Sequence, residues 1–348
     1  MNLLRRLGAP NGSLAIGVGI ALAGIAALLL LTTPAQGVER STVEQQLRGS
    51  MLDLIEAAGG PPLAIAVVQR GNERKVQSVG FADLDRINLA HARERMRIAS
   101  TSKAISGGVA LSLVAEGTLS LDDTVGEWLP DQPVAWHAVT LSQLLNHTSG
   151  LPDFTATKAF ADAVTASPEV APGPQTLLSY AAGQPLNFPP GSDYRYSNSD
   201  NIAVGLIVQA ATNADYPTAL RTQVFKPLGM GRSQLSPDLA IPKPLIHGYD
   251  VGEVPPEHVT NVIAFGGWAW ASGGIVSTPG NLNKFIRGYA GGALFGGPTR
   301  AAQYTFIPSP TQSPQDPART RPGWRCSATR PTAARFTATP GRSSATRS

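Results

Sequence analysis

The chain of 348 residues is long enough for one large domain or two intertwined subdomains, and its 36 glycines and 29 prolines favour a loop-rich fold. A single cysteine, Cys326, excludes an intramolecular disulfide framework and a multi-thiolate metal cluster. Of the net charge of +4, residues 308–348 contribute +6 through seven arginines and Asp316, so the rest of the chain carries −2. That balance argues against a nucleic-acid-binding face, and the five histidines lack the spacing of a zinc site.

The N-terminus has the pattern of an export signal. Arg5 and Arg6 precede an apolar run over residues 14–31, and the small-residue stretch 33–35 follows it. A cationic flank, an apolar run and a small-residue site are typical of a secretory signal peptide. The run is also long enough for a membrane anchor that is never cleaved. We therefore predict that residues 1–36 are a signal peptide or membrane anchor, and that the protein works outside the cytoplasm.

The predicted elements follow an α+β order. Apolar spacing predicts a helix over residues 41–58. The apolar run 63–68 predicts a buried strand, residues 71–72 a turn, and residues 75–81 the hairpin partner of that strand. Further helices are expected over residues 100–116, 140–145 and 199–210, and a strand, turn and helix start over 271–279, with that helix continuing to residue 289. This order predicts an antiparallel sheet backed by helices.

Ser100 and Lys103 lie three positions apart at the start of the second of these helices, so the hydroxyl and the amine can meet on one face. Serine is a poor nucleophile until a neighbour takes its proton. Lysine can take that proton only when burial or another cation lowers its pKa. By itself the spacing fits equally an N-cap serine followed by a solvated lysine, so further motifs have to decide.

Four further motifs follow in order: Leu144-Leu145-Asn146-His147-Thr148-Ser149-Gly150-Leu151, Tyr196-Ser197-Asn198, Lys226-Pro227-Leu228-Gly229-Met230 and Gly273-Gly274-Ile275-Val276-Ser277-Thr278. Together with Ser-x-x-Lys, they resemble the serine β-lactamase and DD-peptidase superfamily, in the branch of class C β-lactamases, D-alanyl-D-alanine carboxypeptidases and related esterases. The resemblance covers residues 41–307 and implies an α+β fold, with an antiparallel sheet flanked by helices and a mostly helical subdomain.

The resemblance implies a mechanism in which Ser100 attacks an amide, lactam or ester carbonyl and forms an acyl-enzyme. Lys103 would accept or relay the serine proton. Tyr196 would act as a phenolate or proton shuttle, because a neighbouring cation lowers the pKa of a phenol. Asn198 would bind the substrate amide and steady Lys103, and the backbone N–H of Ser100 would be one oxyanion donor. Neither a metal nor an organic cofactor is implied.

Some residues in these motifs have competing interpretations. The stretch 199–201 spells the Ser-Asp-Asn element of class A β-lactamases, but it overlaps Tyr196-Ser197-Asn198, and no Glu-x-x-x-Asn acid follows it. We favour the Tyr-x-Asn element and interpret Asp200 as a carboxylate in the first turn of a helix. His147 could act as a base, but a hydrogen-bonded loop histidine is the favoured interpretation. For Trp268 and Trp270, a core position is favoured over an acyl pocket.

One element of the superfamily has no counterpart, namely a C-terminal strand bearing His-Thr-Gly, Lys-Thr-Gly or a close variant. Residues 308–348 contain no such triplet and read as a disordered tail rich in Pro, Arg, Ser and Thr. Shifting the reading frame, however, lets residues 336–341 encode Tyr-Gly-His-Thr-Gly, and 321–330 encode Ala-Gly-Leu-Ala-Leu-Phe-Arg-Tyr. We therefore hypothesise a frameshift between residues 308 and 319. As written, the chain is expected to lack its C-terminal strands and to be poorly active.

These observations predict an exported, monomeric serine hydrolase that acts on a small-molecule or peptide substrate, such as a peptidoglycan stem peptide, a β-lactam or an ester. An esterase of the same fold stays open, as does a catalytically dead penicillin- or peptidoglycan-binding module. Nucleic acid is not an expected partner.

Overall fold

The computed structural model describes residues 36–57, 63–82, 89–167, 170–235, 241–248, 265–305, 307–308 and 324–325. The chain divides into two compact units, Met1–Gln45 and Gln46–Ser348, and all the predicted site residues belong to the second. Helix α1 (Gln36–Ala57) runs through the boundary. The apolar run at residues 14–31 lies outside the described residues, and none of the helices that are described has the length and hydropathy needed to span a bilayer.

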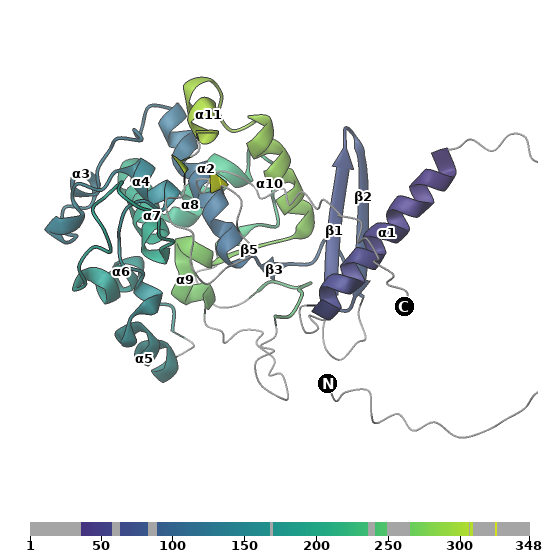
Figure 1. Cartoon of the computed structure of the whole chain (residues 1–348), viewed down its shortest axis with the longest axis horizontal. Coiled ribbons are helices and arrows are strands. Elements are labelled where there is room, and N and C mark those ends of the chain that lie inside the picture. Colours follow the sequence, from purple (N-terminus) through teal and green to yellow (C-terminus); the bar gives the residue numbers. More distant parts are fainter. Residues whose placement is uncertain are drawn as a thin grey trace, which may run out of the picture. The chain divides into compact units, whose positions relative to one another are not determined.

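The sheets are small and antiparallel. Strands β1 (Leu63–Arg70) and β2 (Glu73–Gly80) form the predicted hairpin, with Leu63 opposite Gly80. In a second sheet, β5 (Ile275–Ser277) lies between β3 (Met96–Arg97) and β4 (Gln234–Leu235). Strand β5 therefore joins segments that are far apart in the sequence, directly beside the start of helix α2 (Ser102–Ala115) (Figure 1).

Helices make up most of the second unit (Figure 1). Beyond α2 they are α3 (Val125–Trp128), α4 (Leu141–Asn146), α5 (Lys158–Ala166), α6 (Pro174–Ala182), α7 (Asn198–Thr212), α8 (Tyr216–Leu220), α9 (Phe265–Gly273), α10 (Pro279–Gly291) and α11 (Gly297–Gln303). Short 3₁₀ turns lie at η1 (Ala99–Thr101), η2 (Val134–Trp136) and η3 (Phe154–Ala156), and a π-helical turn, η4, at Arg221–Phe225.

The core forms around α2 and α7, which pack against each other and against α9. Both helices are buried on nearly every side, and Ile105, Val109, Ile202 and Ile207 are fully buried. Burying such a side chain stabilises a fold by roughly 1.5–3 kcal/mol. Because α2 is enclosed, its polar residues have to find their hydrogen-bond partners inside the protein.

Local sequence explains the loop that follows α4. Thr140 and Gln143 form a capping box at the start of this helix, which ends at His147 in the left-handed conformation (φ 60°). Gly150 follows with φ +76°, and a Cβ atom at this position would overlap the carbonyl oxygen of Phe188. Only glycine fits there.

The predicted α+β class is confirmed, and the helix expected over 41–58 begins earlier, at Gln36. Most of the predicted disordered tail lies outside the described residues. Two of its residues, Trp324 and Arg325, form strand β7, which pairs with β6 (Ile307–Pro308). The tail prediction did not include this pair, because a two-residue strand leaves no periodic pattern in the sequence.

Candidate active site

Ser100 lies in the 3₁₀ turn η1, just before α2, and not inside the α-helix as the spacing predicted. The turn is held from both sides: the N–H of Ile98 donates to the carbonyl of Ile275 (3.1 Å), and the N–H of Ile275 donates to Ser102 Oγ (3.3 Å). Ala99 has φ +43°, which is unfavourable for a residue with a Cβ atom. Strain of this kind persists only where the surroundings impose it, and here it precedes an exposed serine.

A polar seam joins α2 to the chain that leads into β5. Ser106 Oγ donates to the carbonyl of Ala271 (2.9 Å), and Tyr216 OH donates to Ser106 Oγ (2.7 Å). These buried contacts hold the next residue, Ser272, so that its carbonyl oxygen lies 2.6 Å from Lys103 Nζ. These contacts thus satisfy the buried hydroxyl of Ser106 and position a carbonyl at the site.

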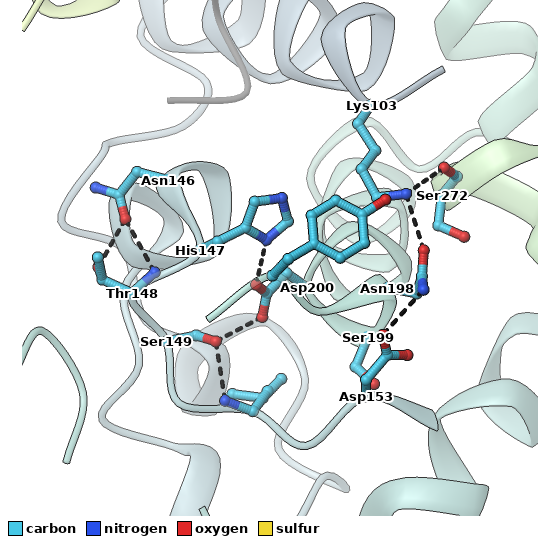
Figure 2. Close-up of polar contacts among 12 residues, drawn as sticks. Lys103, Asn146, His147, Thr148, Ser149, Asp153, Asn198, Ser199, Asp200 and Ser272 are labelled. Carbon is cyan, nitrogen blue, oxygen red and sulfur yellow. Dashed lines mark hydrogen bonds and ion pairs between the residues drawn. The ribbon is translucent and has the colours of Figure 1, made fainter. Parts of the chain in front are cut away.

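Lys103 Nζ has three oxygen neighbours. Figure 2 shows two of them, the Ser272 carbonyl and Asn198 Oδ1 at 2.9 Å, and the third is Ser100 Oγ at 3.3 Å. The first two can only accept hydrogen bonds, whereas the serine hydroxyl can also donate. A neutral amine has two N–H groups and one lone pair. It therefore satisfies both fixed acceptors with its N–H groups and keeps its lone pair for the serine proton.

The surroundings of Lys103 make this neutral form accessible near neutral pH. The residue is only 4% exposed, and burial lowers its pKa from 10.5 to about 8, while the charges of Asp153 and Asp200 act in the opposite direction. At pH 7 roughly one molecule in ten then carries the neutral amine, which is far more than an exposed lysine would provide.

Tyr196 completes the group: its hydroxyl lies 2.8 Å from Ser100 Oγ, and Lys103 Nζ lies 4.8 Å from the centre of its ring. The expectation that a cation lowers the pKa of this phenol is wrong for this site. Partial burial raises the pKa of Tyr196, more than its hydrogen bond with Ser100 lowers it. Tyr196 is therefore a protonated donor at neutral pH and not a phenolate.

Asn198 is the first residue of α7, and Ser197 is its N-cap. While Asn198 Oδ1 accepts from Lys103, its Nδ2 donates to Asp153 Oδ2 (3.0 Å) and to Thr155 Oγ1 (3.3 Å). Sequence analysis did not find Asp153. It caps the short turn η3, which is an ordinary role, and no local pattern distinguishes it from any other capping aspartate.

The residues of the competing Ser-Asp-Asn element do not reach Ser100 or Lys103 in any contact that the structure describes. Ser199 Oγ donates to the carbonyl of Pro152 (2.7 Å). Asp200 is in the first turn of α7, as expected, but it is fully buried and not exposed to solvent there. It accepts from His147 Nδ1 (2.7 Å) and Ser149 Oγ (2.5 Å), as Figure 2 shows, and burial raises its pKa.

His147 is a buried, hydrogen-bonded loop residue, which agrees with the favoured interpretation. Its ring centre lies 4.8 Å from that of Tyr196, so His147, which is hydrogen-bonded to Asp200, packs against the phenol ring. Trp268 and Trp270 also take the core positions expected of them: Trp268 packs edge-on against Phe160, and Trp270 lies against Tyr216. In the described part of the chain, no three His, Cys, Asp or Glu side chains are grouped to hold a metal ion.

Comparison with known proteins places the chain in the family that its motifs resemble. A family model described as Beta-lactamase matches residues 47–342. Protein flp of Staphylococcus aureus (strain NCTC 8325 / PS 47) is 26% identical over 231 residues, which are 65% of this chain and 45% of that protein. Penicillin-binding protein 4* of Bacillus subtilis (strain 168) is 28% identical over 183 residues, 52% of this chain and 39% of that protein. The chain spans less than half the length of these curated relatives.

Among solved structures, the D-stereospecific amidohydrolase from Streptomyces sp. superimposes with a TM-score of 0.65 at 26% sequence identity. The match covers 72% of this chain and 75% of that one.

Proposed function

The chain belongs to the beta-lactamase family of serine hydrolases, and from that premise we propose that it cleaves amide or lactam bonds through an acyl-enzyme on Ser100. One observation carries the proposal. The Ser100 hydroxyl lies between Tyr196 OH and Lys103 Nζ, and the other two partners of Lys103 are oxygens that can only accept. The lone pair of the neutral amine therefore has one available proton to take.

In the acylation step, Lys103 takes the proton of Ser100 as the serine oxygen bonds to the substrate carbonyl carbon. The Tyr196 hydroxyl then gives its proton to the leaving nitrogen, and the Lys103 ammonium reprotonates the phenolate. Lys103 ends neutral, Tyr196 ends protonated and the proton of Ser100 has moved to the leaving group. Asn198 keeps the amine in place throughout, because Asp153 holds its amide from the other side.

For the substrate, we propose an acyl group with a D-configured residue, as in a D-alanyl-D-alanine peptide or a D-amino acid amide. The support is similarity to a D-stereospecific amidohydrolase and to a penicillin-binding protein. A β-lactam presents a related carbonyl. An ester would use the same three residues, so we test it beside the amides.

We also propose that the protein is exported, on the strength of the pattern in residues 1–36. N-terminal sequencing of the protein recovered from the culture medium and from the membrane fraction tests this and separates a cleaved signal from an anchor. Recovery only from the cytoplasm would contradict it.

A catalytically dead binding module is the second candidate, and a specific observation favours it. Residues 308–348 carry no His-Thr-Gly or Lys-Thr-Gly, and a missing oxyanion donor typically costs on the order of a hundred- to a thousandfold in rate. We propose that a frameshift between residues 308 and 319 replaced this element. Resequencing the gene tests that, and an undisturbed frame without a downstream His-Thr-Gly refutes it.

A fluorescent penicillin distinguishes the candidates, with Ser100→Ala as the control. Attachment to the wild type alone, located at Ser100 by mass spectrometry, supports the acyl-enzyme. A long-lived adduct then indicates a peptidase and rapid release a lactamase, while parallel assays use D-alanyl-D-alanine peptide, D-phenylalanine amide and p-nitrophenyl acetate. If the wild type is not labelled and turns over none of these, the hydrolase proposal fails, and peptidoglycan binding decides for the dead module.

A further inference from the structure

A cavity of about 810 Å³ lies in the second unit, and none of its lining residues belongs to the Ser100 site. It is formed by four segments that are distant in the sequence: the β1–β2 hairpin, residues 91–93, residues 227–232 and the first three turns of α10. A cavity of this size is within the range that holds a small-molecule ligand.

The lining of this cavity is strongly cationic. It contains no Asp or Glu, but five side chains that are positively charged at neutral pH and one histidine. These residues are Arg74, Arg93, Arg232, Lys284, Arg287 and His91. None of the five cations forms an ion pair with a carboxylate among the described residues. Glu94, next to Arg93, turns its carboxylate to the backbone N–H of His91 (2.9 Å) and does not line the cavity. All five cations are exposed, so water screens their mutual repulsion, but they face one space whose lining holds no carboxylate.

Several of these cations are held in place by backbone carbonyls. Arg232 Nη1 donates to the carbonyl of Arg93 (2.8 Å), Lys284 Nζ to that of Gly229 (2.5 Å), and an Arg287 guanidinium N–H to that of Gly71 (3.3 Å). Each of these bonds uses one donor and leaves others free, since a guanidinium has five N–H groups and an ammonium three. These three side chains are thus held at the wall of the cavity, and each keeps N–H donors for a ligand.

Helix α10 adds to the same field. Thr278, its N-cap, and Asn281 line the cavity and are both more than nine-tenths buried. The positive end of the helix dipole therefore lies at the wall of the cavity, where it favours an anion. The helix N-terminus and the five cations are separate features, and both favour a negatively charged ligand.

We propose that this cavity binds a small ligand that carries two or more phosphate groups. Five positive charges around one cavity need several negative charges for balance, and the planar fork of arginine matches phosphate oxygens in a bidentate way. The ligand can be free in solution or the headgroup of a lipid, since both present the same chemistry. The site is independent of the hydrolysis proposed for Ser100.

Calorimetry on the full chain tests the proposal with inorganic pyrophosphate, with citrate as a tricarboxylate of comparable charge, and with vesicles containing cardiolipin, whose headgroup carries two phosphates, in phosphatidylcholine. The double variant Arg74→Gln/Lys284→Gln removes two exposed lining cations. The matched control, Lys158→Gln/Arg221→Gln, makes the same change in net charge at exposed positions outside the cavity. Circular dichroism and thermal melting confirm that each variant is folded.

We expect pyrophosphate to bind the wild type and the control pair equally, and the cavity variant at least about tenfold more weakly. If the vesicles also bind, and bind the cavity variant more weakly, the ligand is a lipid headgroup. If the vesicles do not bind, the ligand is a free phosphate compound. The proposal is overturned if neither probe binds, if citrate binds as tightly as pyrophosphate, or if both double variants lose affinity alike. If Arg74→Gln/Lys284→Gln does not fold, the single variant Lys284→Gln replaces it, with Lys158→Gln as its control.

Discussion

Replacing Lys103 by methionine tests the protonation state on which the proposed chemistry depends, without any knowledge of the substrate. Methionine has a similar length and no charge, so it fits the buried position beside Ser272 and Asn198. It removes a base from the site, and it also removes an amine that burial holds in an unfavourable environment. We therefore expect a change in the pH dependence of stability as well as a loss of acylation.

The size of the effect follows from the two pKa values of this lysine. In the unfolded chain it titrates near 10.5, and in the fold at about 8, so between these values the unfolded state holds more protons and stability rises with pH. The depressed pKa destabilises the fold by about 3 kcal/mol at pH 7 and by about 1.5 kcal/mol at pH 9.5. The variant lacks this pH-dependent destabilisation. Its stability relative to the wild type should therefore fall by about 2 kcal/mol between pH 7 and 9.5.

Urea unfolding followed by far-UV circular dichroism at pH 7 and pH 9.5 measures this difference, and both values lie below the ordinary tyrosine pKa of about 10. In the variant the carbonyls of Ser272 and Asn198 lose a partner, which lowers its stability equally at both pH values. This loss therefore does not affect the comparison. The control is Lys226→Met, which removes an exposed ammonium and should give the same difference from wild type throughout. A pH-independent difference for Lys103→Met would refute the neutral amine, and with it the proposed base.

Three further changes follow from the same geometry. Tyr196→Phe should slow labelling of the serine by fluorescent penicillin about a hundredfold and leave stability within about 1 kcal/mol, since the residue is 41% exposed; an unchanged rate would remove the phenol from the proton path. Asp200→Asn should lower the free energy of unfolding in urea by about 2–4 kcal/mol, because one buried donor then faces an amide N–H; a near-neutral effect would contradict the buried network. Gly150→Ala should destabilise by about 2 kcal/mol or more through its positive φ and the overlap with Phe188, whereas Gly183→Ala, which has open space, should be nearly neutral by the same measurement.

The parts of the fold that depend on local pattern could be predicted from the sequence. The hairpin follows from an apolar strand, the turn at Gly71 and a partner strand, and α4 follows from the Thr140 cap and its capping box. The grouping of Ser100 with Lys103 also has a local cause, because they lie about one turn apart. Tyr196 and Asn198 could be placed beside them only through the order of motifs, since nothing local brings residues 95 positions apart into contact.

The contacts that decide the chemistry could not be predicted in this way. The Ser272 carbonyl is a backbone atom 169 residues from Lys103, and no side chain signals its role. Asp153 looks like any other cap, and Asp200 looks like a first-turn carboxylate until its burial is known. The pKa of Tyr196 was predicted in the wrong direction because a neighbouring cation can be inferred from a motif, whereas desolvation depends on the packed surroundings.

The same limit explains why counting charges missed the cationic cavity. The chain outside residues 308–348 is slightly acidic on average, and the average hides where the charges lie. The cations of the cavity come from four segments, each with one or two basic residues, and none of these forms a run that a sequence scan would detect. Burial of Lys103 lowers its pKa at a cost in stability, and the clustering of five exposed cations adds a smaller cost that water screens. Such costs are retained where a function requires them, which is the physical reason for assigning a role to each.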